Sequence, residues 1–273
     1  MTTRADTGVS VLASGAVVVP GYEVVAHLSR GADLDVYDAW SLDRQCRCVV
    51  KVLRPDQGGN RSVARRLINE GTLLTRITHP HLVRCFEVVR GSQPAVVLET
   101  LCGQTLSHLI ESRGSRLPII DLAFLGMHLT SAVGYLHRNG VLHLDVKPSN
   151  VVCQAGKAIV IDLSLARPEG RAPKGCGTAQ YLSPEQARGG SLGPAADVWG
   201  IGATLFHAAT GVRPFPASAD GQYVQLTGSA PAIRTHRRVP GWFGELIDSC
   251  LSPTPSGRPT MVELAADLEA PFA

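Results

Sequence analysis

Two patterns of hydrophobic positions follow one another along this chain. Up to about residue 97, short runs rich in β-branched residues alternate with turns, and one stretch, Arg61–Ile77, instead has apolar residues at a spacing of three and four. Runs with a period of two, joined by turns, indicate an antiparallel sheet, here carrying one helix. The predicted strands are Tyr22–Leu28, Leu34–Trp40, Cys46–Leu53, Leu82–Arg90 and Ala95–Leu98.

From Leu106 onward the pattern is mainly helical, with loops rich in proline and glycine between the helices. Glu99–Gly103 is the expected hinge between the two halves. We therefore expect an α+β fold with an N-terminal extension over 1–20, a mainly β lobe over 21–99 and a mainly helical lobe over 100–273. The predicted helices are Leu106–Ser112, Asp121–Asn139, Ser183–Arg188, Ala195–Thr210, Trp242–Cys250 and Met261–Glu269.

Composition narrows the class of protein. The chain has 273 residues, 44% of them hydrophobic, and a net charge of only +3, which argues against nucleic acid or a membrane surface as a partner. Cys46 and Cys48 are separated by one residue, so neither a redox motif nor a zinc knuckle is indicated, and seven scattered cysteines suit a reducing, cytoplasmic location. Val198–Val212 is too short to span a membrane. The apolar segment Val9–Val19 lacks a strongly basic flank, which favours an N-terminal extension over a signal peptide.

The strongest chemical signal begins with Asp145 and Asn150, which are five positions apart in a predicted loop. Asp162 follows, after a predicted hairpin. Oxygen ligands of this kind can converge on Mg²⁺, which proteins usually share between carboxylates and the phosphates of a nucleotide. Lys147 adds a mobile positive charge beside them. A polar surface turn would explain this loop alone, but further spaced features agree with a nucleotide site.

One such feature is Glu70, which lies on the apolar face of the predicted helix with Leu67 and Leu74. A carboxylate there requires a cationic partner, because an unpaired buried charge is costly. Lys51, in a predicted strand, is the natural candidate, and it could hold phosphates while Glu70 positions it. The turn around Gly31 could close backbone N–H groups over phosphates, although by itself it is typical of a plain hairpin.

Taken together and in this order, these segments resemble a eukaryotic-type protein kinase of the serine/threonine branch found in bacteria, over about Tyr22–Leu268. Gly177–Glu185 resembles the P+1 loop and the Ala-Pro-Glu motif, with serine for alanine. Asp197–Gly202 resembles the start of the buried αF helix. Cys250–Thr260 resembles the late segment whose arginine, here Arg258, pairs with the glutamate of that motif, here Glu185.

The resemblance implies a bilobal protein-kinase fold, an antiparallel β N-lobe with one αC helix and a mainly helical C-lobe. It implies transfer of the ATP γ-phosphate to Ser/Thr hydroxyls of protein substrates, with Mg²⁺ as the metal and Mn²⁺ as an alternative. Asp145 would orient the substrate hydroxyl or accept its proton, and Lys147 would contact the γ-phosphate. Asn150 and Asp162 would hold the metal, and Thr178 would shape the peptide site.

The same resemblance implies the nucleotide contacts. Adenine is expected between Val36 and Val49 on one side and Val152 on the other, with its polar edge at the backbone of Glu99 and Leu101 beside a gatekeeper at Leu98. The full set of implied ATP-binding residues is Leu28, Gly31, Val36, Val49, Lys51, Glu99, Leu101 and Val152, and the implied structural residues are Glu185, Asp197 and Arg258.

Several positions depart from the family pattern. Ser29 and Leu34 replace two of the three loop glycines, which predicts a looser grip on phosphate because only glycine reaches positive φ cheaply. Val49 replaces an alanine and narrows the adenine slot. Ser164, two positions after Asp162, stands where the family usually has a glycine. Leu144 replaces the arginine that commonly precedes the catalytic aspartate.

That last departure has a counterpart in the activation loop. In relatives that have the arginine, it pairs with a phosphorylated residue of this loop. Here Leu165–Cys176 contains no serine, threonine or tyrosine, so the cation and its phosphate partner are missing together. We predict that activity does not require activation-loop phosphorylation. The segment is rich in arginine, proline and glycine, and we expect it to be mobile, with Cys176 as an exposed, inert thiol.

Two other functions compete. A pseudokinase-like nucleotide-binding regulatory module is favoured by the altered glycine loop and Val49. A small-molecule phosphotransferase with the same acidic core is disfavoured by Lys147, Trp199 and Arg258. The sequence leaves open whether two copies pair as a homodimer, and nothing in it requires this.

Overall fold

The structure is a computed structural model that describes residues 10–112, 116–217 and 221–272. The chain divides into two units, which are described separately. The first contains the residues up to Thr78 together with Val83–Leu101, and the second contains His79–Leu82 and the chain from Cys102 onward. The division at Leu101 falls inside the expected hinge interval.

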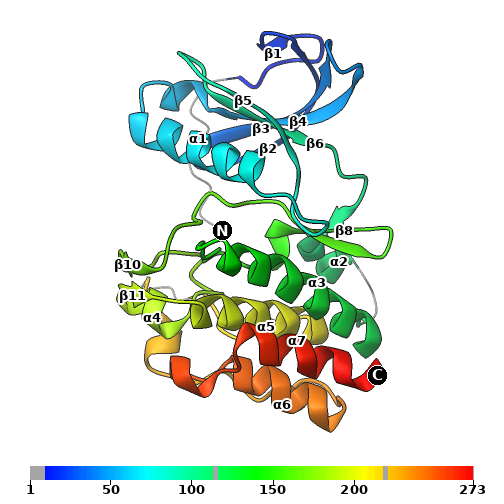
Figure 1. The fold of residues 1–273 in the computed structure, drawn as a ribbon, viewed down its shortest axis with the longest axis vertical. Coiled ribbons are helices and arrows are strands. Elements are labelled where there is room, and N and C mark those ends of the chain that lie inside the picture. The colour runs from blue at the N-terminus through cyan, green and yellow to red at the C-terminus, as the bar shows by residue number, and fades with distance from the viewer. Residues whose placement is uncertain (1–9, 113–115, 218–220, 273) are drawn as a thin grey trace. The chain divides into compact units, whose positions relative to one another are not determined.

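An antiparallel sheet of six strands forms most of the first unit, in the order β1-β2-β3-β4-β6-β5 (Figure 1). The N-terminal strand β1 was not expected, and its Val18 and Val19 are buried, so the segment just before residue 21 belongs to this unit. The elements are β1 (Val17–Val19), β2 (Tyr22–Arg30), β3 (Leu34–Ser41), β4 (Cys46–Leu53), α1 (Arg61–Arg76), β5 (Cys85–Val89) and β6 (Ala95–Glu99).

Helix α1 begins because the side chain of Asn60 accepts hydrogen bonds from the N–H groups of Ser62 and Val63, which satisfies two of the free donors of the first turn. The helix then packs on one face of the sheet. It approaches so closely at Gly71 that a Cβ there would lie 2.6 Å from a methyl group of Val96. The opposite face carries a separate apolar cluster that includes Val50.

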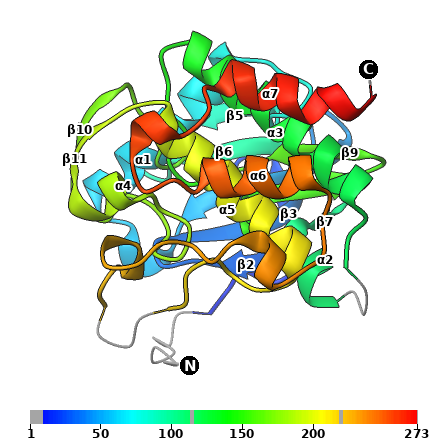
Figure 2. The same ribbon diagram turned by 90° about the horizontal axis from the view of Figure 1, so that it is seen from below.

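Helices make up most of the second unit. Helix α5 is its centre, since all of its residues from Ala196 to Thr210 are buried, and it packs against α3, α6 and α7 (Figure 2). The helices are α2 (Leu106–Ser112), α3 (Ile119–Arg138), α4 (Pro184–Arg188), α5 (Ala195–Thr210), α6 (Gly241–Cys250) and α7 (Met261–Glu269).

Two small antiparallel sheets complete the second unit. One has three strands, β7 (Gln104–Thr105), β8 (Val151–Gln154) and β9 (Lys157–Val160), and the other pairs β10 (Gly170–Ala172) with β11 (Gly190–Leu192). These elements confirm the α+β protein-kinase architecture that the sequence predicts, with the sheet in one unit and most helices in the other.

Within the described ranges, one helix, α3, is long and apolar enough to cross a membrane, and the sequence did not single this helix out. Its apolar stretch is 56% buried in the second unit, where the helix packs against α5 and α7. Burial of this kind is typical of the core helix of a globular domain.

Candidate active site

Three side chains of the second unit are mutually hydrogen-bonded, two from the loop of residues 143–150, here called the catalytic loop, and one, Thr178, from the segment that follows the activation loop. Lys147 Nζ donates to Asp145 Oδ2 and to Thr178 Oγ1, both at 2.6 Å. The Thr178 hydroxyl donates to Asp145 Oδ1 at 2.7 Å. Both carboxylate oxygens of Asp145 are therefore held in fixed directions, and the ammonium group lies where it can meet a phosphate that approaches the carboxylate.

The potential metal ligands lie beside this group. Asn150 Nδ2 donates to the backbone oxygen of Asp145 at 3.0 Å and to its Oδ2 at 3.2 Å, which directs the side chain of Asn150 toward the catalytic loop. The β8–β9 hairpin then returns the chain, and Ile161 N donates to Asn150 O at 3.0 Å, so Asp162 follows directly beside Asn150. Carboxylate and amide oxygens are hard ligands that fit Mg²⁺ shared with phosphates.

A buried carboxylate anchors the backbone of the catalytic loop. Asp197 of α5 is 1% exposed, and it accepts hydrogen bonds from the backbone N–H groups of His143 and Leu144 at 2.8 and 2.7 Å. His137 Nε2 bonds to the same carboxylate at 2.8 Å. Leu144 has a φ of +64°, a conformation that is costly for a branched residue and that persists only where the surroundings hold it.

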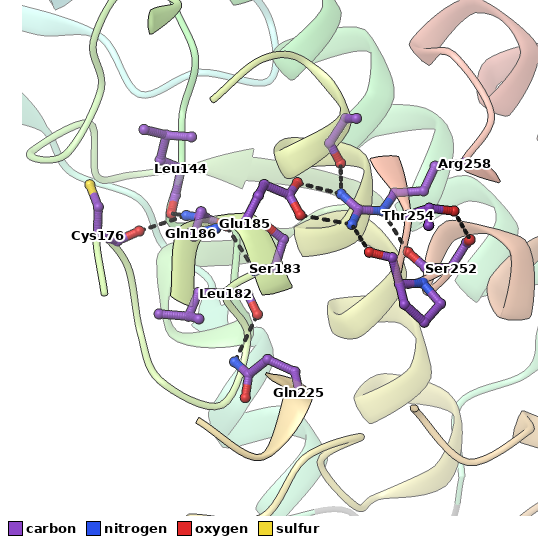
Figure 3. A network of polar contacts seen from close by, with 12 residues as sticks. Leu144, Cys176, Leu182, Ser183, Glu185, Gln186, Gln225, Ser252, Thr254 and Arg258 are labelled. Carbon is purple, nitrogen blue, oxygen red and sulfur yellow. Dashed lines mark hydrogen bonds and ion pairs between the residues drawn. The ribbon is translucent and has the colours of Figure 1, made fainter. Parts of the chain in front are cut away.

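The segment after Thr178 is tied to the far end of the unit. Glu185 of α4 accepts two hydrogen bonds from Arg258, at 2.6 and 2.9 Å, and the same guanidinium donates to the backbone oxygens of Ala195 and Ser252 (Figure 3). Helix α4 begins with a capping box between Ser183 and Gln186. The structure thus brings together the implied structural pair Glu185 and Arg258.

Backbone pairing holds two parts of the activation loop, residues 165–176. Leu142 and Arg167 exchange two backbone hydrogen bonds, at 2.8 and 3.0 Å, and β10 pairs with β11. Cys176 was expected at the surface, and this is wrong, because it is only 9% exposed and packs with Leu144 and Leu192. Burial raises the pKa of the Cys176 thiol, in keeping with an inert side chain.

In the first unit, Lys51 and Glu70 form the expected ion pair. Lys51 Nζ lies 2.7 Å from Glu70 Oε1, and the two side chains are 12% and 1% exposed. Strand register places Lys51 opposite Val36, and Val49 opposite Leu98. Opposite and second-neighbour residues of paired strands share a face of the sheet. The side chains of Val36, Val49, Lys51 and Leu98 therefore lie on the face that α1 covers, where Lys51 meets Glu70.

The turn between β2 and β3 is closed by charged groups as well as by backbone contacts. Arg30 donates to both carboxylate oxygens of Asp35, at 2.7 and 2.9 Å, and Gly31 N donates to Leu34 O. Burial raises the pKa of Asp35, but the bonds from Arg30 and His27 outweigh it and leave the pKa below its ordinary value.

Two further arginines hold the tip of this turn. Arg54 Nη1 donates to the backbone oxygens of Gly31 and Ala32, at 3.2 and 3.3 Å, and Arg66 of α1 pairs with Asp33 at 2.6 Å. The Arg66–Asp33 pair links the loop to the helix that carries Glu70. A loop short of glycine is thus constrained by side chains, which the family pattern did not predict.

The remaining implied ATP-binding residues belong to both units. Leu28 is exposed on β2, and Glu99 ends β6, where its N–H and carboxylate bond the backbone of Arg84. Leu101 is the last residue of the first unit, and Val152, which is 7% exposed, lies on β8 in the second unit.

The sequence did not predict the supporting roles of five polar residues, because isolated polar residues have no characteristic spacing along the chain. These residues are Arg54, Arg66, His137, Gln186 and Gln225.

The chain matches the protein kinase domain family over residues 22–268. It is 31% identical over 265 residues to the serine/threonine-protein kinase PknB of Mycobacterium tuberculosis and 28% identical over 269 residues to a probable serine/threonine-protein kinase of Clostridium perfringens. These alignments cover 90% and 93% of this chain but 42% and 39% of the relatives, so the chain spans about two fifths of their length.

Solved structures agree on the fold. The crystal structure of the M. tuberculosis PknI kinase domain superimposes with a TM-score of 0.75, covering 96% of this chain and 99% of that one, at 23% sequence identity. At this identity, the likeness concerns the fold alone.

Proposed function

Because this chain belongs to the protein kinase domain family, we propose that it is an active serine/threonine kinase that transfers the γ-phosphate of Mg·ATP to hydroxyl groups of protein substrates. The observation that carries the proposal is the closed triangle of Asp145, Lys147 and Thr178, with hydrogen bonds of 2.6 to 2.7 Å. A chain that only bound nucleotide would have no need to hold a carboxylate and an ammonium group in this arrangement.

The residues have separate tasks in this proposal. Asp145 orients the acceptor hydroxyl and takes its proton, while Lys147 and Lys51 offset charge on the phosphates. Glu70 holds Lys51 in place through their 2.7 Å contact. Asn150 and Asp162 would hold Mg²⁺, which supplies positive charge to phosphate oxygens. Positioning and electrostatic stabilisation are then the main sources of rate enhancement.

We also propose that activity does not depend on phosphorylation of Leu165–Cys176. The side chain of Leu144 is buried in an apolar cluster with Leu142, Cys176, Leu192 and Ala196, so residue 144 itself supplies no positive charge to a phosphate on the loop. The Thr178 hydroxyl is already engaged with Asp145 and Lys147. Mass spectrometry of the active protein should find that the region from Ser164 to Thr178 carries no phosphate on which activity depends.

The deciding experiment measures phosphoryl transfer from labelled ATP to a generic basic protein. Wild-type protein should label the acceptor on serine or threonine, and Asp145→Asn should lower the rate by about 100-fold or more, the range that removal of general-base catalysis produces. Asp121→Asn, at an exposed position of α3, is the matched control. Equal background from wild type and Asp145→Asn would instead support the nucleotide-binding regulatory module.

We also propose a cytoplasmic location for this protein. All seven cysteines are free thiols in the structure, as is typical of proteins from a reducing compartment.

A further inference from the structure

One side-chain amide joins the catalytic loop to the activation segment. Gln186 of α4 is 1% exposed, and its Nε2 donates to Leu144 O at 2.8 Å and to Cys176 O at 2.6 Å (Figure 3). Its Oε1 accepts from Ser183 N, and its backbone oxygen accepts from Gly175 N. Both N–H donors of the amide are thus used, each by a backbone carbonyl of a different segment.

The carbonyl of Leu144 has particular importance, because Leu144 directly precedes Asp145 and adopts a φ of +64°. Asp197 holds the N–H of Leu144, and Gln186 holds its carbonyl oxygen. The activation segment passes so close to this carbonyl that a Cβ at Gly177 would lie 2.9 Å from it. The strained peptide before the catalytic aspartate is therefore held from two sides, and Gln186 is one of them.

A second buried amide braces the next part of the same segment. Gln225, in the short 3-10 helix Val224–Leu226, is 4% exposed. Its Nε2 donates to Ala179 O and to Leu182 O, both at 2.9 Å. These carbonyls flank Tyr181 in the stretch that follows Thr178. Two glutamines thus bind four backbone carbonyls of the catalytic and activation segments.

We propose that Gln186 and Gln225 are positioning residues with separate tasks, an inference that rests on the proposed kinase function. Gln186 fixes Leu144 and hence the direction of the Asp145 carboxylate, so it supports phosphoryl transfer. Gln225 fixes Ala179–Leu182, so it supports binding of the substrate peptide. Neutral amides hold these segments permanently, whereas an arginine–phosphate pair would exist only after phosphorylation.

The substitution Gln→Glu tests this, because it keeps the shape of the side chain but removes both donors and places a carboxylate beside two carbonyl oxygens. We expect Gln186→Glu to lower kcat at least ten-fold while the KM for the peptide changes less than three-fold. Gln225→Glu should raise the KM for the peptide at least ten-fold while kcat changes less than three-fold. Gln222→Glu, at an exposed glutamine of the same unit, is the matched control and should change neither.

Hydrogen exchange of the nucleotide-free protein supplies a readout that does not depend on catalysis. Gln186→Glu should speed exchange at the amide of Gly175, and Gln225→Glu should speed exchange at the amides of Tyr181 and Leu182, each at least ten-fold. If Gln186→Glu does not fold, Gln186→Leu, which also lacks the donors but adds no charge, should show the same exchange pattern.

The outcomes separate this inference from the proposed function. If the wild-type protein transfers no phosphate, the proposed kinase function is wrong. The hydrogen-exchange rates would still show whether Gln186 and Gln225 hold the segments that they contact. The inference fails if both Gln→Glu variants change kcat and KM in the same proportion, or if exchange at Gly175, Tyr181 and Leu182 stays at the wild-type rate.

Discussion

Glu185 and Arg258 lie 73 positions apart and are joined by two hydrogen bonds, at 2.6 and 2.9 Å (Figure 3). Arg258 is 6% exposed, and its guanidinium also lies 4.9 Å from the ring centre of Trp199. Burial raises the pKa of the Glu185 carboxyl, but the bonds and charge of Arg258 outweigh it and leave this pKa below its ordinary value. The Glu185 carboxyl is thus ionised at neutral pH, and its two bonds to Arg258 tie α4 to the segment before α7.

Removing the cation should destabilise the protein strongly. Arg258→Ala leaves the Glu185 carboxylate without its charged partner, and breaking a buried ion pair in this way costs about 3–5 kcal/mol. Urea unfolding monitored by circular dichroism measures the loss. Arg238→Ala, at an exposed arginine, is the control and should change the free energy of unfolding by less than about 0.5 kcal/mol. Similar losses for both variants would contradict the structural role of the pair.

Neutralising Glu70 should impair use of ATP. Glu70→Gln keeps the shape of a side chain that is 1% exposed but removes the charge that holds Lys51. A hydrogen bond to a charged group contributes about 1.5–3 kcal/mol, so kcat/KM for ATP should fall by about 10- to 100-fold. Steady-state kinetics with varied ATP measure this. Glu111→Gln, at an exposed position, is the control. Equal kcat/KM values for the two variants would contradict a role of Glu70 in the use of ATP.

The Asp33–Arg66 pair should have a small, salt-sensitive effect. Its side chains are 36% and 47% exposed, and exposed pairs contribute about 0.2–1 kcal/mol. Asp33→Asn should therefore raise the KM for ATP by no more than about five-fold at low salt, with little difference from wild type at high salt. The charge-swapped double variant Asp33→Arg with Arg66→Asp should restore part of the affinity. An effect independent of salt would show that the pair does not act electrostatically.

Acid should destabilise the second unit through His207. Burial, and next the charge of Arg213, lower the pKa of His207 to about 4, and its Nδ1 lies 2.7 Å from the hydroxyl of Tyr181. The unfolded chain has an ordinary histidine pKa of about 6.5. Between these values the unfolded state binds a proton that the folded state does not, so the free energy of unfolding decreases as the pH falls from about 6.5 toward 4.

His207→Gln should reduce this dependence. Urea midpoints at pH 7.5, 6 and 5 should drop less steeply in the variant than in wild type. His108→Gln, at an exposed histidine, is the control and should keep the wild-type slope. A wild-type slope in His207→Gln would mean that another group causes the acid sensitivity.

Several elements of the fold could be predicted because their signals are local. The strand Cys46–Leu53 and the helices Ala195–Thr210 and Met261–Glu269 have the predicted bounds, and α1 ends one residue before its prediction. The strand β1 was missed, since a run of three valines becomes a strand only by pairing with β2. The predicted strand from Leu82 to Arg90 starts instead at Cys85, because Leu82 forms a parallel bridge with Val160 in the second unit.

The sequence by itself determined the family, the fold class and the order of the chemical residues, because periodicity and motif spacing are properties of neighbours along the chain. Only the tertiary structure decided how that chemistry is supported. Gln186 bonds Leu144 and Cys176, 42 and 10 positions away, and Gln225 bonds Ala179, 46 positions away. Such partners meet only when distant segments are buried together. Because water does not reach a buried amide, its N–H groups must donate to carbonyl oxygens of the protein itself.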